Sequence, residues 1–255
     1  MAIVNKPDTA LPVFTESGET GACWSCGDMR AAHFCQACGR LQPALPADYF
    51  TFFGLPRRLN LDPSTLEREF YNLSRKLHPD LYVRASKQER EWSLEKSSQL
   101  NDAYRTLKDP ISRTQYLLRL EGVQLEEQSK AATEQAKQKG EEKKQVVPPD
   151  LLEEVFELNL QLEELRAGKK MGEGDPAVVA ELQKAKTHLE EKLGGLGAEL
   201  KSYWDRWDAL VEREAGGEVV PEPERHRVRD QMVDLLNRRS YIRNLVRDVN
   251  EALED

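Results

Sequence analysis

A short turn, Leu77-His78-Pro79-Asp80, separates two stretches that both carry the apolar pattern of amphipathic helices. Apolar side chains recur every three or four residues on either side of it: Leu66, Phe70, Leu73 and Leu77, then Leu100, Ala103, Tyr104 and Leu107. Pro79 cannot continue the first helix, and it biases His78 out of the helical region. The pattern therefore predicts an antiparallel helix pair with His78, Pro79 and Asp80 on an exposed turn, where polar residues favour contact with another molecule.

Two further helices are expected around this pair. Asp62 followed by Pro63 is typical of a helix start, since the aspartate caps and the proline suits the first turn. Asp109-Pro110 repeats the signal, and Gly122 ends the segment that follows. The expected elements, in order, are an aromatic turn of helix at 48–55 and helices at about 62–77, 86–108 and 109–122.

All the cysteines of the chain lie in two Cys-x-x-Cys pairs, each followed by a glycine: Cys23, Cys26, Cys35 and Cys38. Such a turn aims both sulfurs at one point, and the glycine permits a positive φ. Two turns together supply four thiolates to a tetrahedral ion, which suits Zn²⁺. The segment is too small to bury a core, so metal binding would supply its folding energy. Structural zinc is the prediction, and four protein ligands leave no open position for catalysis.

The spacing of the cysteines also has other interpretations. Two disulfides fit the even count but not a chain without a secretion signal. A thioredoxin-type redox motif needs a βαβ context that the sequence lacks. Iron in a rubredoxin-like site, or an iron–sulfur cluster on the same thiolates, fits the spacing as well as zinc does. His33 is expected to be a bystander, and Trp24 to pack over the cysteine turns.

Composition limits the class of protein. Charged residues make up 32% of the 255 residues and hydrophobic ones 39%, which with few β-branched runs favours helices. The formal net charge of −8 argues against a nucleic-acid partner, and no apolar run is long enough to span a membrane. We expect a cytoplasmic protein, or a mitochondrial one if this is the mature form of a eukaryotic protein, and favour a monomer.

The second half of the chain reads as three long helices after a charged, apolar-poor linker at 123–149. Gly168 to Pro176 is expected to end the first helix, and Gly194, Gly195 and Gly197 to kink or interrupt the second. Gly216 to Pro223 precedes the third. Short breaks between long amphipathic helices predict an antiparallel three-helix bundle.

Four segments of the first half together resemble a J-domain of the HscB (Hsc20) type of co-chaperone, which serves iron–sulfur cluster assembly. They are Asp48-Tyr49-Phe50 with Phe53-Gly54-Leu55, Lys76-Leu77-His78-Pro79-Asp80, Asn101 to Leu107, and Pro110 to Leu118. The cysteine turns are similar to a module found in some members. The resemblance implies a mainly α fold: flexible tail 1–20, zinc-ribbon-like tetracysteine module 21–46, four-helix J-domain 47–122, linker 123–149 and client-binding bundle 150–255.

The same resemblance implies the roles of individual residues. His78, Pro79 and Asp80 would engage the ATPase domain of a DnaK/HscA-class chaperone and stimulate ATP hydrolysis. Basic residues on the preceding helix would steer an acidic partner surface toward the turn: Arg68, Arg75 and Lys76. An IscU-type scaffold would bind an apolar and acidic strip formed by Leu152, Phe156 and Glu157. Glu153 stands where bacterial relatives have an apolar residue, and Leu160 where they have an acid.

No enzyme is expected. The chain has no phosphate-binding Gly-x-x-x-x-Gly-Lys-Ser/Thr loop, and His188 and His226 stand apart from any nucleophile. The sequence predicts a co-chaperone that presents a client to a chaperone ATPase. Two alternatives are a zinc-ribbon adaptor that binds protein or nucleic acid, and a metallochaperone that carries iron on its four cysteines.

Overall fold

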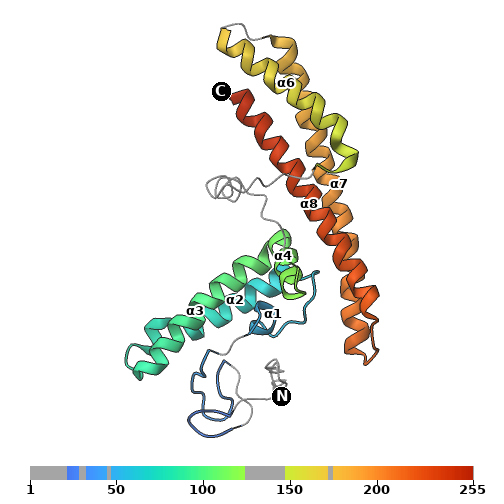
Figure 1. Ribbon diagram of the computed structural model, residues 1–255. Coiled ribbons are helices and arrows are strands. Elements are labelled where there is room, and N and C mark those ends of the chain that lie inside the picture. Colours follow the sequence, from blue (N-terminus) through green and yellow to red (C-terminus); the bar gives the residue numbers. More distant parts are fainter. Residues whose placement is uncertain (1–21, 29–32, 45–46, 124–146, 172–174, 255) are drawn as a thin grey trace, which may run out of the picture. The chain divides into compact units, whose positions relative to one another are not determined.

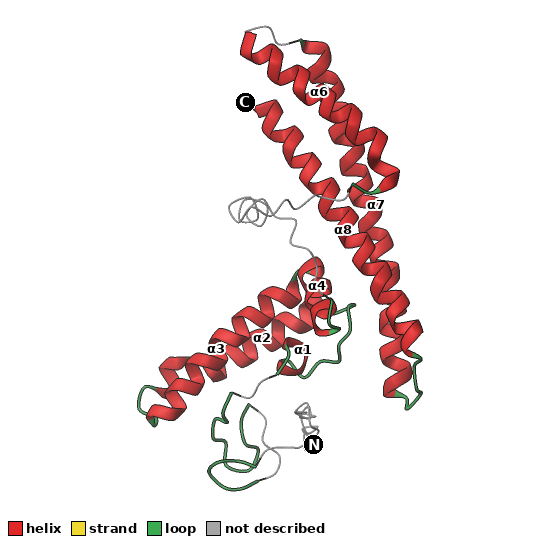
Figure 2. Cartoon of the chain, in the orientation of Figure 1, coloured by secondary structure: helices red, strands yellow, loops and turns green. Residues whose placement is uncertain are grey.

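The computed structural model describes residues 22–28, 33–44, 47–123, 147–171 and 175–254. The chain divides into two compact units, Met1–Leu120 and Glu121–Asp255, which we describe separately. Within the described ranges the regular structure is helical, and the only β pairing is a single bridge between Phe34 and Leu41 (Figure 2). The mainly α prediction is confirmed. No helix among the described residues combines the length and the apolar character needed to cross a membrane.

The first unit holds the predicted four helices, and their boundaries follow the local signals (Figure 1). They are α1 (Tyr49–Phe52), α2 (Pro63–Leu77), α3 (Lys87–Lys108) and α4 (Pro110–Leu120), with a 3-10 turn η1 at Pro79–Tyr82. The Asp62 side chain caps α2 by accepting hydrogen bonds from the backbone N–H groups of Ser64 and Thr65. Gly122 follows α4 with a φ of +78°.

The core of this unit lies where α2 and α3 run side by side, with α1 and α4 packed against α3 near one end of the pair (Figure 1). The expected apolar stripes are buried there, with Phe70, Leu73 and Tyr104 partly so. The largest fully buried side chains are Phe50, Leu41, Leu59, Leu77, Leu100, Leu107, Leu117 and Leu118. Asp48 caps α1 and also pairs with Arg57 at 2.9 Å. The packing holds the end of α2, and so the turn after it, in a fixed position.

The second unit contains three helices after a short 3-10 turn, η2 (Pro149–Leu151): α6 (Leu152–Met171), α7 (Pro176–Ala215) and α8 (Glu222–Glu254). Helices α7 and α8 form a long antiparallel pair, and α6 covers one half of it (Figure 1). The inward face of α8 is buried, at Val228, Met232, Leu235, Leu236, Ile242, Leu245 and Val249.

One prediction about glycine in this unit is wrong. Helix α6 ends at Met171, within the break expected from Gly168 to Pro176, but α7 is one uninterrupted helix through Gly194, Gly195 and Gly197. Each glycine lowers helix stability by only about 1 kcal/mol, and burial of Leu189, Leu196 and Leu200 nearby outweighs that cost. The predicted tail 1–20 and nearly all of the linker 123–149 lie outside the described residues.

Candidate functional site

The four cysteines come together as the sequence predicts. Their sulfur atoms all lie within 4.8 Å of one another, and the Sγ–Sγ distances are 3.7 Å for Cys23–Cys38 and 3.6 Å for Cys26–Cys35. A tetrahedral ion with metal–sulfur bonds of about 2.3 Å holds its ligands about 3.8 Å apart. The donor set therefore fits a single four-coordinate metal ion, and all four positions are filled by protein sulfur.

Each cysteine pair is shaped by a tight backbone turn. Gly27 N donates to Cys23 O at 2.9 Å and Gly39 N to Cys35 O at 2.8 Å, and the two glycines have φ values of +77° and +70°. A side chain is strained at such angles, so glycine is required at both places. Desolvation acts to raise the pKa of Cys23, but hydrogen bonds from the backbone of Cys26 and Ser25 and from the Gln42 side chain lower it to about 6. Cys23 therefore ionises readily, whereas at Cys26 a backbone hydrogen bond from Asp28 is outweighed by the Cys35 sulfur and burial, which raise the pKa of Cys26 to about 12.

His33 lies outside this donor set, as expected. Its Nε2–H donates to Phe52 O at 2.8 Å, and its Nδ1 accepts a hydrogen bond from Lys96 Nζ at 3.2 Å. Burial, and the neighbouring Lys96 charge, lower the pKa of His33 to about 4, so the ring is neutral at pH 7. Trp24 donates from Nε1 to Leu41 O at 2.7 Å but also packs edge-on against Trp92 of α3. Both side chains join the tetracysteine module to the four-helix part.

The His-Pro-Asp turn is exposed. His78 ends α2 with φ −58° and ψ 129°, and Pro79 opens η1. The His78 and Asp80 side chains are 56% and 85% exposed, and Asp80 N donates to His78 Nδ1 at 3.3 Å. The imidazole therefore faces solvent and not the core.

Two hydroxyl groups on α3 hold this turn, and the sequence analysis did not identify them. Ser93 Oγ and Ser97 Oγ both donate to Leu77 O, at 2.7 and 2.9 Å. That carbonyl belongs to the last residue of α2, where the helix leaves backbone acceptors without helical partners. Two serines four residues apart on α3 were the available sequence signal, because that spacing places both on one helix face.

The predicted basic residues Arg68, Arg75 and Lys76 are all exposed on α2. Arg75 and Lys76 lie in its last turn, next to the His-Pro-Asp turn. Arg68 lies two turns earlier, with its Nε 3.6 Å from Glu69 Oε1. The three cations thus lie on the helix that leads into the turn, as the steering hypothesis requires.

Helix α6 carries an apolar strip on its exposed side. Leu152, Phe156 and Leu160 are 54%, 66% and 52% exposed, and their four-residue spacing places them on one face. Glu157 is also exposed. On the opposite side of the helix, Leu158, Leu162 and Leu165 are buried. Leu160 was not predicted as a site residue, although its spacing from Phe156 was the signal.

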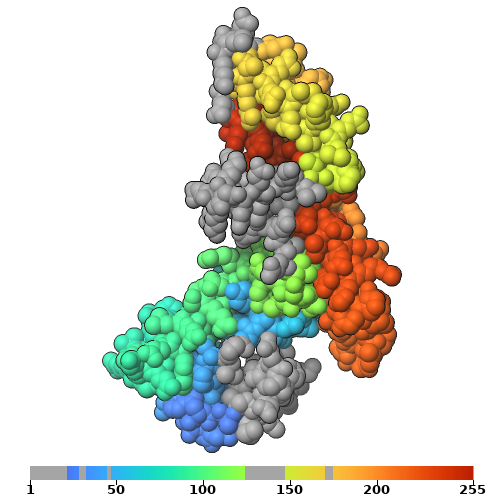
Figure 3. Space-filling view, viewed as in Figure 1, coloured from blue at the N-terminus to red at the C-terminus, as the bar shows by residue number. Residues whose placement is uncertain are grey.

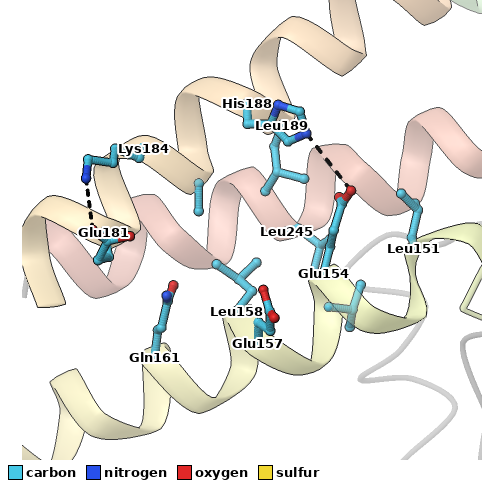
Figure 4. Close-up of a pocket in the computed structure, with 12 residues that line it drawn as sticks. Leu151, Glu154, Glu157, Leu158, Gln161, Glu181, Lys184, His188, Leu189 and Leu245 are labelled. Carbon is cyan, nitrogen blue, oxygen red and sulfur yellow. Dashed lines mark hydrogen bonds and ion pairs between the residues drawn. The ribbon is translucent and has the colours of Figure 1, made fainter.

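A cavity of about 290 Å³ lies beside this strip, among α6, α7 and α8 (Figure 4). Its apolar wall includes Leu151, Leu158, Leu189 and Leu245. Its rim is polar, and Figure 4 shows His188 of α7 directed at Glu154 of α6. Glu157 lines the rim of the cavity and is exposed next to Phe156, so the cavity adjoins the apolar strip.

Comparison with known proteins identifies the family. Residues 48–116 match the DnaJ domain. A co-chaperone protein HscB homolog of Vibrio vulnificus is 35% identical over 143 residues, which are 56% of this chain and 75% of that protein. The chain belongs to the HscB family.

Other HscB proteins match over shorter shares of their length. The Arabidopsis thaliana iron-sulfur cluster co-chaperone protein HscB homolog is 37% identical over 142 residues, 55% of this chain and 50% of that protein. The mouse iron-sulfur cluster co-chaperone protein HscB is 38% identical over 111 residues, 41% and 47% of the two chains. The matched part thus spans about half the length of these two relatives.

The crystal structure of the human co-chaperone protein HscB shows the same fold. It superposes with a TM-score of 0.55 at 23% identity and covers 91% of this chain and 98% of that one. The predicted HscB-type fold is confirmed. The relatives are named as co-chaperones, which agrees with the expectation that no enzyme is encoded.

Proposed function

We propose that this HscB-family chain is a co-chaperone of iron–sulfur cluster biogenesis that stimulates the ATPase of a DnaK/HscA-class chaperone and delivers an IscU-type scaffold to it. The observation that carries the proposal is the exposed His78-Pro79-Asp80 turn. It lies within the segment that matches the DnaJ domain and directly follows the basic last turn of α2. The names of the plant and mouse relatives support the iron–sulfur assignment.

The turn and α2 would act together on the chaperone. Arg68, Arg75 and Lys76 attract an acidic surface of the ATPase domain and raise the rate of encounter. Asp80 can then pair with a cation of the partner, since its carboxylate is 85% exposed. Serine hydroxyls from α3 hold the carbonyl of Leu77, so the turn is presented in one conformation and little ordering is needed on binding.

The client would bind the strip of Leu152, Phe156 and Glu157 on α6, with Leu160 as a further contact. An exposed apolar row with an acidic neighbour on one helix suits a shallow apolar groove with a basic edge on the scaffold. Two surfaces on one chain bring client and chaperone together, which raises the effective concentration of each at the other.

The tetracysteine module would hold structural zinc through Cys23, Cys26, Cys35 and Cys38. The sulfur spacing and the closed donor set support a structural ion. When bound, the ion supplies folding energy to a segment with few buried apolar residues of its own. We place the protein in the cytoplasm or the mitochondrion, which fractionation of cells with an antibody to the chain would test.

The test is His78→Gln in a single-turnover ATPase assay with the cognate chaperone. We expect stimulation to fall to the basal rate while the circular dichroism spectrum and unfolding midpoint stay unchanged, because His78 is exposed. His226→Gln is the matched control, since His226 is also half exposed on a helix. Full stimulation by His78→Gln would overturn the proposal.

The steering residues have a test of their own. Arg75→Glu combined with Lys76→Glu should raise the concentration needed for half-maximal stimulation, and the effect should shrink as ionic strength rises. Lys87→Glu is the control, because Lys87 is an exposed cation on α3. An effect independent of salt would contradict electrostatic steering.

A further inference from the structure

The tetracysteine module contacts the start of α3, the helix that follows the His-Pro-Asp segment. Figure 3 shows the blue atoms of the module lying against the turquoise atoms of this region. Trp24 of the first cysteine turn meets Trp92 edge-on, with ring centroids 5.7 Å apart. Arg40, which follows the second cysteine turn, bonds Glu89 from Nη1 to Oε1 at 3.1 Å. Each cysteine turn therefore contributes one contact to the first two turns of α3.

The position of Arg40 depends on the cysteine turns. Its carbonyl oxygen accepts hydrogen bonds from Cys35 N at 2.9 Å and from Gln42 Nε2 at 2.8 Å. Its guanidinium lies 5.6 Å from the centre of the Trp24 ring, a cation–π distance. A metal ion that joins the two cysteine turns therefore also fixes the backbone of Arg40 relative to the ring on which its side chain rests.

Glu89 divides its two carboxylate oxygens between the module and the cap of α3. Oε1 accepts from Arg40, and Oε2 accepts from Ser86 N at 3.2 Å and Ser86 Oγ at 2.8 Å. Ser86 Oγ in turn accepts from Glu89 N, which completes a capping box. The Glu89 side chain is only 6% exposed, so its bonds to Ser86 are shielded from water, while the Arg40 side chain is 52% exposed. Hydrogen bonding to Ser86 and Arg40 outweighs the effect of burial and lowers the pKa of Glu89, which keeps it ionised.

This cap is where the His-Pro-Asp segment joins α3. The chain from Pro79 leads directly to Ser86, and Arg90 of the first α3 turns donates from Nη1 to Val83 O at 3.3 Å. Tyr82, in the middle of the segment, donates its hydroxyl to Lys76 O at 3.0 Å. Burial raises the pKa of Tyr82, and the negative charge of Glu89 raises it further, so Tyr82 and Glu89 interact electrostatically.

We propose that the metal-loaded module acts on the His-Pro-Asp turn through Arg40 and Glu89, with Arg40 as a positioning residue for the chaperone-binding segment. Metal binding sets the position of Arg40, Arg40 holds one oxygen of Glu89, and the other oxygen caps α3 where segment 79–85 ends. The functional half of this inference rests on the proposed ATPase stimulation; the structural half does not. A module that is only anchored to α3 would leave segment 79–85 unaffected by its loss.

The structural half is tested by amide hydrogen exchange on the full chain loaded with Zn²⁺, measured by mass spectrometry. Arg40→Ala should speed exchange over residues 79–90 about fivefold, the upper end of the effect expected when a half-exposed ion pair is lost. Zinc removal with a chelator should do at least as much in the same segment and leave α8 unchanged. Lys87→Ala is the control, because it removes an exposed cation from the first turn of α3, which also holds Glu89. Unchanged exchange over 79–90 in both Arg40→Ala and the zinc-free chain would overturn the proposal.

Conservative variants separate positioning from simple anchoring. Arg40→Lys keeps the charge but lacks the fork, so it should restore part of the protection. Arg40→Ala and Glu89→Gln should be non-additive, because they remove one interaction; additive effects would overturn the coupling. In the ATPase assay Arg40→Ala should raise the half-maximal concentration severalfold and leave the maximal rate unchanged. If the wild-type chain stimulates no ATPase, the proposed function fails while the exchange data still decide the coupling. Changed exchange with an unchanged half-maximal concentration would overturn the functional half alone.

Discussion

Replacing Phe156 with alanine should weaken binding of an IscU-type scaffold without destabilising the chain. The Phe156 side chain is 66% exposed on α6. A phenylalanine covers about 200 Å², so about 130 Å² is left for a partner to bury. At about 25 cal/mol per Å² this area is worth about 3 kcal/mol, or about two hundredfold in Kd. Because binding also orders side chains and buries area imperfectly, we expect a loss between about tenfold and two hundredfold.

The assay is isothermal titration calorimetry of the scaffold against wild-type and variant chains, paired with urea unfolding of each chain. Phe156→Ala should change the free energy of unfolding by less than about 0.5 kcal/mol, as substitutions at exposed sites do. Leu158→Ala, on the buried side of the same helix, should instead cost about 2 to 5 kcal/mol of stability. Leu94→Ala is the matched control for affinity, since Leu94 is 60% exposed but lies on α3.

The reasoning is refuted if Phe156→Ala binds the scaffold within about twofold of wild type, a difference of only about 0.4 kcal/mol. It is also refuted if Leu94→Ala weakens binding as much, because the loss would then reflect general apolar exposure. The double variant Phe156→Ala with Leu160→Ala tests whether the scaffold also contacts Leu160, which lies four residues after Phe156 on the same face of α6. A larger loss than in the single variant would include Leu160 in the contact.

Two further predictions concern the tetracysteine module and its contact with α3. Metal analysis of protein purified without added metal should give one zinc per chain, and Cys35→Ser should lower the metal affinity; iron instead of zinc would favour the metallochaperone alternative. Burial lowers the pKa of Lys96 to about 8 from its usual 10.5. The cost of burying the charged amine is therefore complete below pH 8, where Lys96 is protonated in both states, and it vanishes above about pH 10.5, where Lys96 is neutral in both states. Lys96→Met removes this cost but also the hydrogen bond to His33, so it should raise the free energy of unfolding by roughly 1 to 2 kcal/mol at pH 7. Urea unfolding should show this stabilisation shrinking as the pH rises from about 8 to about 10.5.

Sequence reasoning located the helices of the first unit because their ends are marked locally. Asp62 with Pro63 starts α2, and Pro79 follows its last turn, so the helix at Pro63–Leu77 could be placed from neighbouring residues alone. The metal ligands could also be predicted from neighbouring residues, since each Cys-x-x-Cys pair spans only four residues and is followed by its own glycine. Signals of this kind need no knowledge of which distant segments meet.

The features that sequence reasoning missed depend on packing between distant segments. Gly194, Gly195 and Gly197 read as helix breakers, yet α7 continues through them because leucines on either side are buried. The bond between Arg40 and Glu89 joins positions 49 residues apart; Arg40 belongs to no recognisable motif, and the Ser86–Glu89 capping box marks only the start of α3. Leu160 falls between these cases, because its spacing was visible but its exposure depends on how α6 packs.

The buried side of α3 changes character along its length, and this change accounts for the place of the module. From Leu100 onward it is apolar, but before that the buried residues are polar: Glu89, Ser93 and Lys96. Each has a partner outside α3, respectively Arg40, the carbonyl of Leu77 and His33. Buried polar groups are costly unless they are paired, so these residues are stable only while their partners remain in place. Two of the three partners belong to the tetracysteine module and the third is the last carbonyl before His78. Loss of the module would therefore leave polar groups unpaired on the same stretch of α3 that holds the His-Pro-Asp turn.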